Sequence, residues 1–69
     1  MKLDQTNKDI LEHLSSGLTT KEISKKISVS IPMIVKRMWE LRIQTKSKNN
    51  VELAIWWERY KNIPTPTQE

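Results

Sequence analysis

Apolar residues recur along the chain at the spacing of amphipathic α-helices, and turn or capping residues divide this pattern into four segments. The segments that we expect to be helical cover about residues 6–16, 20–27, 31–44 and 50–62. Pro64 disfavours helical geometry in the residue before it, so the chain is expected to continue as a flexible tail over 64–69. The pattern therefore predicts an all-α fold with one four-helix domain over residues 1–63.

Residues that cap helices stand at the expected boundaries. The polar run at 6–9 can cap the first helix, and Gly17 suits the left-handed conformation that closes it. Thr19 and Glu22 have the spacing of a capping box, in which each side chain accepts a hydrogen bond from a backbone N–H at the start of the second helix. Asn49 is a suitable N-cap for the fourth helix.

The third segment, which Ser30 can cap, is apolar on more than one face. Three of its apolar residues follow the spacing i, i+4 and i+7 and are expected to be buried: Ile34, Met38 and Leu41. The residues expected to point away from this stripe are Val35, Lys36, Trp39 and Ile43. On the same exposed side, Lys36 and Glu40 have the spacing of an ion pair, which we expect to form. The alternative for Glu40 is to accept a hydrogen bond from cytosine N4.

The fourth segment has two apolar faces, and a domain of four helices cannot bury both of them. The face expected in the core consists of Leu53, Ala54, Trp57 and Tyr60. The opposite face carries Val51, Ile55 and Arg59. Two interpretations of this second face stay open, a contact with a second copy of the chain and scattered apolar residues on the surface of a monomer.

Composition narrows the classes of function. The chain has 69 residues, no Cys and one His, so it lacks the residues of a disulfide framework, a thiolate zinc site or a catalytic triad. We therefore expect no enzymatic activity and no cofactor. Neither an apolar leader nor a run of about 18 apolar residues is present, which favours a cytoplasmic protein that does not enter a membrane.

Positive charge is concentrated in the middle of the chain. Residues 21–48 carry eight basic and two acidic side chains, a net charge of +6, whereas residues 1–20 and 49–69 each carry −1. A basic segment of this kind is typical of a surface that binds a polyanion such as nucleic acid. A solvated basic face without a partner has the same charge, so charge alone does not separate the two.

The second and third segments have the arrangement of a helix-turn-helix, in which two helices are joined by three or four residues. The first helix of such a motif holds the second through apolar contacts, here Ile23 and Ile27 against Ile34 and Met38. The second helix can then place side chains in a DNA major groove about 12 Å wide.

The run G-L-T-T-K-E-I-S-K-K-I-S-V-S at residues 17–30 resembles the LuxR/GerE-type helix-turn-helix, whose pattern is G-L-[ST]-[NT]-K-E-I-A-x-x-L-x-I-S. The resemblance continues without a gap through Ile34, Leu41 and the run V-E-L-A at 51–54, and it covers residues 3–60. It implies the four-helix LuxR-type fold and binding to double-stranded DNA.

The resemblance also implies roles for individual residues. Those expected to contact base edges are Val35, Lys36 and Trp39. Those expected to contact phosphates are Thr20, Lys21, Lys46 and Lys48. Arg37 is a further candidate for a phosphate contact, and the alternative is a hydrogen bond inside the domain. The phosphate contact is favoured because a guanidinium buried in the domain would need a partner there. The dimer contact of the family's last helix is matched by Val51, Ile55 and Arg59.

The sequence departs from the family pattern at several positions. Arg37 replaces a histidine, Met33 a threonine and Val35 a common lysine. The run Gln44-Thr45-Lys46-Ser47 replaces the usual K-L-G-V, so Lys46 stands at the place of the glycine. The chain therefore differs most from the family at the end of the third helix and in the turn that follows.

Two functions are compatible with these features. The first is a sequence-specific DNA-binding transcription regulator that acts as a homodimer on a near-palindromic site. The alternative is a protein-binding module of the same fold that docks on RNA polymerase or another regulator through Trp39 and its neighbours Val35, Ile43 and Trp56.

Family members usually carry an N-terminal receiver or ligand-binding domain. Because Met1 lies just before the first helix, we expect either a freestanding regulator or an excised effector domain.

Overall fold

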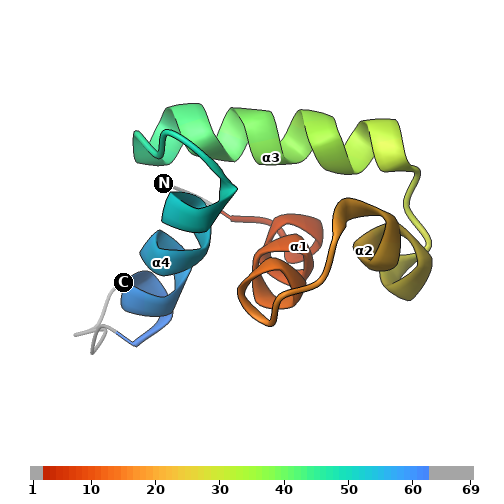
Figure 1. Ribbon diagram of the computed structural model, residues 1–69, viewed down its shortest axis with the longest axis horizontal. Coiled ribbons are helices and arrows are strands. Elements are labelled where there is room, and N and C mark those ends of the chain that lie inside the picture. Colours follow the sequence, from red (N-terminus) through yellow and green to blue (C-terminus); the bar gives the residue numbers. More distant parts are fainter. Residues whose placement is uncertain (1–2, 63–69) are drawn as a thin grey trace.

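The computed structural model describes residues 3–62, and this part of the chain contains helices and no strands (Figure 1). The helices are α1 (Gln5–Ser15), α2 (Thr20–Ile27), α3 (Ile31–Thr45) and α4 (Asn50–Lys61). The predicted all-α class with four helices is confirmed, and each helix begins and ends within a residue of its expected bounds. The tail predicted over 64–69 lies outside the described residues.

Local capping interactions fix the ends of the first two helices. α1 begins one residue earlier than predicted because Asp4, rather than the run at 6–9, is its N-cap: Asp4 Oδ1 accepts the backbone N–H three residues on at 2.8 Å. Gly17 has a φ of +91° and closes α1, as predicted. The predicted capping box is present, with Thr19 N–H donating to Glu22 Oε1 at 2.8 Å and Glu22 N–H donating to Thr19 Oγ1 at 3.2 Å.

The core has two halves that meet at α1. One half contains Ile10, Ile23, Ile34 and Met38. The other contains Leu11, Leu41, Leu53 and Trp57. The predicted buried stripe of α3 and the predicted burial of Trp57 are thereby confirmed. Tyr60, which the pattern placed in the core, is instead 42% exposed, because its ring stacks at the rim on Trp56 with 4.8 Å between ring centroids.

A polar cluster joins α1 to α4. Glu12 Oε2 accepts hydrogen bonds from Trp57 Nε1 and from Lys61 Nζ, each at 2.9 Å, and Lys61 also pairs with Glu58 at 3.1 Å. The Lys61 ammonium and the Trp57 indole N–H lower the pKa of Glu12, and the same Glu12 carboxylate together with Glu58 raises the pKa of Lys61. α4 is thus held to α1 by ionic contacts as well as by apolar packing.

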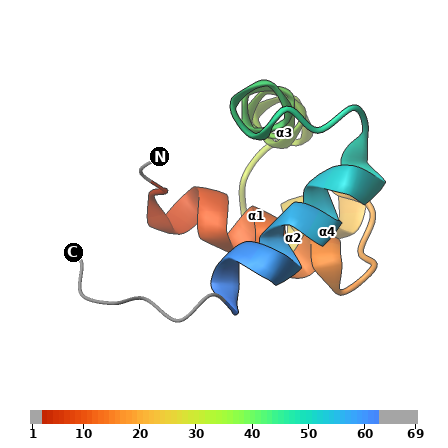
Figure 2. The ribbon, with the colours of Figure 1, turned by 90° about the vertical axis from the view of Figure 1, so that its left-hand side faces the viewer.

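The arrangement of the helices leaves α3 accessible along its length. It lies along one edge of the molecule, with α1, α2 and α4 all on its other side (Figures 1 and 2). The predicted packing of α2 against α3 is confirmed, since Ile23 is buried with Ile34 and Met38 while Ile27 packs against them from the margin. One face of α3 therefore builds the core and the opposite face meets the surroundings.

Candidate nucleic-acid interface

A turn of three residues, Ser28 to Ser30, connects α2 to α3. Ser28 has the left-handed conformation, with φ 56° and ψ 43°, and ends α2. Ser24 Oγ donates to the carbonyl oxygen of Val29 at 2.6 Å, and the Val29 N–H donates to the carbonyl oxygen of Ser24 at 3.3 Å. The Val29 side chain packs against the core. These contacts tie the turn to α2, so α3 leaves it in a fixed direction.

The outer face of α3 carries the three side chains that the sequence predicts as base contacts. Val35 is 51% exposed, Trp39 is 56% exposed and Lys36 is also exposed, whereas Ile34, the residue before Val35, is fully buried. Ile43 continues the same face with 58% exposure. The helical spacing thus assigned these residues to the correct side of α3.

One further residue of this outer face, Ile31, was not among those predicted to point away from the core. Ile31, at the start of α3, is 43% exposed and precedes Val35 by four residues. The signal that could have found it is the repeated interval of four residues from Ile31 through Val35 and Trp39 to Ile43.

Lys36 is accessible to a ligand. The ion pair expected with Glu40 is wrong: among residues 3–62, the pairs within 4.0 Å join Arg37 to Asp4 and Lys61 to two glutamates. An exposed pair at this spacing contributes only about 0.3–0.5 kcal/mol, which is too little to hold two flexible side chains together. The Lys36 ammonium is therefore available for an anion or a base edge.

Arg37 is held inside the domain. Its Nη1 donates to Asp4 Oδ2 at 2.9 Å and to Asn7 Oδ1 at 3.2 Å, and the side chain is half-buried. The backbone N–H of Asn7 and the Arg37 guanidinium together lower the pKa of Asp4. Of the two alternatives for Arg37, the internal hydrogen bond is thus present, and the phosphate contact stays a prediction for the other guanidinium nitrogens.

The residues predicted to contact phosphates lie in two places. Thr20 and Lys21 are the first two residues of α2, where the positive end of the helix dipole favours anions. Lys46 and Lys48 are exposed in the connection that follows α3. Lys46 has a φ of +59°, so its backbone is in the left-handed region. α2 packs on the N-terminal half of α3, whereas this connection leaves its C-terminal end (Figure 1).

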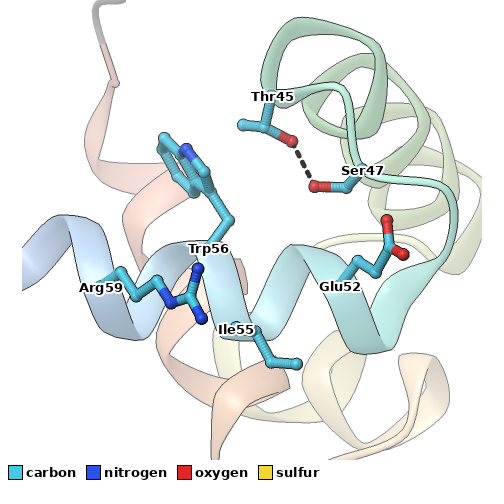
Figure 3. A pocket seen from close by; sticks show the side chains of 6 residues that line it. All are labelled: Thr45, Ser47, Glu52, Ile55, Trp56 and Arg59. Atoms are coloured by element: carbon cyan, nitrogen blue, oxygen red, sulfur yellow. Dashed lines mark hydrogen bonds between the residues drawn. The ribbon is translucent and has the colours of Figure 1, made fainter.

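The predicted dimer face of α4 is exposed and lies away from the core. Val51 is 70% exposed and Ile55 is 47% exposed, and Arg59 is exposed as well. A hollow of 240 Å³ borders this face; it is lined by Thr45, Ser47, Glu52, Ile55, Trp56 and Arg59. Figure 3 shows Trp56 extending from α4 toward Thr45 and Ser47, while Ile55 points away from them.

Comparison with known proteins finds no matching family model, no significantly similar curated protein and no significantly similar solved structure. The resemblance to the LuxR/GerE-type domain therefore rests on the residues quoted above. Within residues 3–62, no helix combines the length and the apolar character that crossing a membrane requires.

Proposed function

We propose that this chain is a sequence-specific DNA-binding transcription regulator of the LuxR type, and that α3 binds in the major groove. The observation that carries the proposal is the outward face of α3, where an accessible Lys36 lies between the exposed Val35 and Trp39. An α-helix with its side chains is about 10–12 Å across, which matches a major groove about 12 Å wide. The net charge of +6 over residues 21–48 supplies attraction to the phosphates.

The proposed roles follow from position. Lys36 donates to guanine O6 and N7, and Val35 and Trp39 contact the surface of neighbouring bases. Thr20 and Lys21 bind a phosphate at the start of α2, and Lys46 and Lys48 bind another beyond the end of α3. The chain acts as a homodimer through the exposed α4 face of Val51, Ile55 and Arg59.

The backbone at Lys46 supports the register of the family resemblance. The LuxR/GerE pattern has a glycine at this place, and a left-handed backbone is the conformation that favours glycine. Lys46 adopts this conformation, with φ +59° and ψ 35°. The backbone geometry that the family pattern implies is therefore present even though the glycine is not.

Binding to duplex DNA tests the proposal, measured by fluorescence anisotropy on sites selected from a random duplex pool. We expect affinity to fall linearly with salt on logarithmic axes, because binding releases counterions. Lys21→Ala should weaken binding to every duplex and reduce the salt slope by about one for each bound subunit, or about two for the proposed homodimer. Lys36→Ala should cost about 1–3 kcal/mol on the selected site and relax its specificity.

Lys8→Ala is the matched control. Lys8 is exposed on α1, outside the proposed interface, so its removal subtracts the same charge without a predicted contact. We expect its affinity to remain close to that of the unmodified chain. Binding that does not depend on salt, or equal losses for all three variants, would contradict the proposal.

A protein-binding function is the second candidate, because Trp39 and Ile43 are both more than half exposed on one helix face. Exposed aromatic and aliphatic residues of this kind are frequent in protein interfaces. The partner in this case is RNA polymerase or another regulator. Binding of purified RNA polymerase that persists in excess competitor DNA and is lost in Trp39→Ala would favour this candidate over the first.

A further inference from the structure

Four large apolar side chains form a continuous stripe on the outer face of α3. The stripe consists of Ile31, Val35, Trp39 and Ile43, each between 43% and 58% exposed. It spans twelve residues, or about 18 Å at 1.5 Å per residue. Each interval of four residues also turns the stripe by about 40°, so only its neighbouring members, such as Val35 and Trp39, face the bases together. One such interval is about 6 Å, or about two base-pair steps of 3.4 Å.

The outer face of α3 offers few groups that can read bases by hydrogen bonds. Its polar side chains are Lys36, the half-buried Glu40 and Arg42, and Gln44 near the C-terminal end. Arg42 Nη1 already donates to Asn50 Oδ1 at 2.6 Å. The Ser30 hydroxyl already accepts the Met33 N–H at 3.4 Å as a cap. Pro32 has no side-chain donor or acceptor. Most of the surface that would face the bases can therefore contribute only apolar contacts.

The major groove presents one apolar group on a base edge, the C5-methyl group of thymine. We propose that α3 recognises its DNA site chiefly through thymine methyl groups, and that the preferred half-site carries thymines on successive steps. This inference rests on the proposed DNA-binding function. The charge of residues 21–48 supports DNA as the occupant of the stripe, because exposed lysines precede and follow α3.

The test compares duplexes that differ only in methyl groups. The probes have about 24 base pairs, a little over two turns: alternating A·T, the same duplex with deoxyuridine for thymidine, alternating G·C, and the same duplex with 5-methylcytosine. Burying one methyl group is worth about 0.8 kcal/mol, or about fourfold in affinity. Contact with two or more methyl groups should therefore make the thymidine duplex bind at least about tenfold tighter than the deoxyuridine duplex.

The duplex with 5-methylcytosine distinguishes two causes of tighter binding, contact with methyl groups and the groove shape of A·T-rich DNA, because it carries methyl groups on G·C pairs. We expect methylated G·C to bind tighter than unmethylated G·C at the same salt concentration. Val35→Ser should reduce the thymidine-to-deoxyuridine affinity ratio by about fourfold, because it removes one apolar contact. Lys8→Ser, which introduces the same serine at an exposed residue of α1 outside the proposed DNA and dimer interfaces, should leave that ratio unchanged.

Three results would overturn the inference, and they are distinguishable. Equal affinity for methylated and unmethylated duplexes, with a normal salt slope, would show DNA binding without methyl recognition and leave the proposed function intact. An absence of salt-dependent binding to all four duplexes would remove the proposed function and the inference together, and would leave protein binding as the candidate role of the α3 stripe. A methyl preference that Val35→Ser does not change would also overturn the assignment to α3.

Discussion

Lys46 combines a charged side chain with a backbone conformation that costs free energy. Its φ of +59° lies in the left-handed region, where a residue with a Cβ is less stable than glycine by about 1–2 kcal/mol. The bond from Ser47 N–H to the Arg42 carbonyl oxygen, at 2.8 Å, closes α3 around this conformation. Local stability therefore does not favour a lysine at this place, and the proposed function gives its ammonium group a phosphate contact.

Lys46→Gly is expected to stabilise the fold and weaken DNA binding. Relief of the left-handed strain, partly offset by the greater freedom of glycine in the unfolded chain, should raise the free energy of unfolding by up to about 1 kcal/mol. Loss of a phosphate contact should lower affinity for all sequences and reduce the salt slope by about one for each bound subunit. Urea denaturation and anisotropy titrations measure the two effects.

Ser28→Gly provides the comparison, because Ser28 is also left-handed, with a φ of 56°, and has no proposed phosphate contact. It should gain stability to a similar extent and keep its affinity for DNA. If Lys46→Gly became more stable and bound DNA as well as the unmodified chain, the phosphate contact assigned to Lys46 would be wrong.

At the scale of the helices, the cluster around Glu12 predicts how stability depends on pH. The pKa of Glu12 is lowered on folding. Its contribution to the free energy of unfolding is therefore present above the ordinary pKa of 4.5 and is lost as the pH falls through the lowered pKa. The pKa of Lys61 is raised, so its contribution is present below 10.5 and is lost as the pH rises through the raised pKa.

Glu12→Gln should therefore lower the free energy of unfolding at neutral pH and make its decrease in acid shallower. Part of the decrease should remain, because the pKa values of Asp4 and Glu22 are also lowered. Denaturation in urea at a series of pH values measures both effects. Lys61→Met should remove most of the alkaline decline while Trp57 keeps its hydrogen bond to Glu12. An acid decline that is the same with and without Glu12 would contradict this account.

The helices could be predicted from the sequence because their determinants are local. The capping box of Thr19 and Glu22 and the N-cap of Asn49, whose Oδ1 accepts the Glu52 N–H at 2.8 Å, involve residues three apart. The cap at Asp4 was missed because the polar run that follows offers several residues of the same type.

Contacts between helices could not be predicted in the same way. Helical spacing indicates which face a side chain occupies, and this placed Val35, Lys36 and Trp39 correctly. It does not identify a partner 33 residues away, as for Arg37 with Asp4, or 45 residues away, as for Trp57 with Glu12. Both pairs depend on how α1 packs on its neighbours, and that packing has no signature in local spacing.

At the scale of the whole molecule, the exposed α4 face predicts self-association. Val51 and Ile55 lie opposite the buried Leu53 and Trp57, and a two-fold contact through them would let two α3 helices reach half-sites about 34 Å apart. We expect sedimentation to show concentration-dependent dimers that Ile55→Asp abolishes.

Ile43→Asp serves as the control for that experiment, because it places the same charge on an exposed isoleucine of α3, outside the proposed dimer face. It should leave the dimer intact. Sedimentation as a monomer at all concentrations would favour the other interpretation of the α4 face, in which its apolar residues are exposed on a solitary chain.

Consecutive residues of α1, Ile10 and Leu11, belong to different halves of the core and are both fully buried. α3 also contributes to both halves, with Met38 in one and Leu41 in the other, so displacing either α1 or α3 exposes both halves at once. The chain should therefore melt in one cooperative transition, and the amide protons of α1 should be among the slowest to exchange with deuterated solvent. Hydrogen exchange followed by magnetic resonance would then give the same opening free energy for amides in both halves of the core.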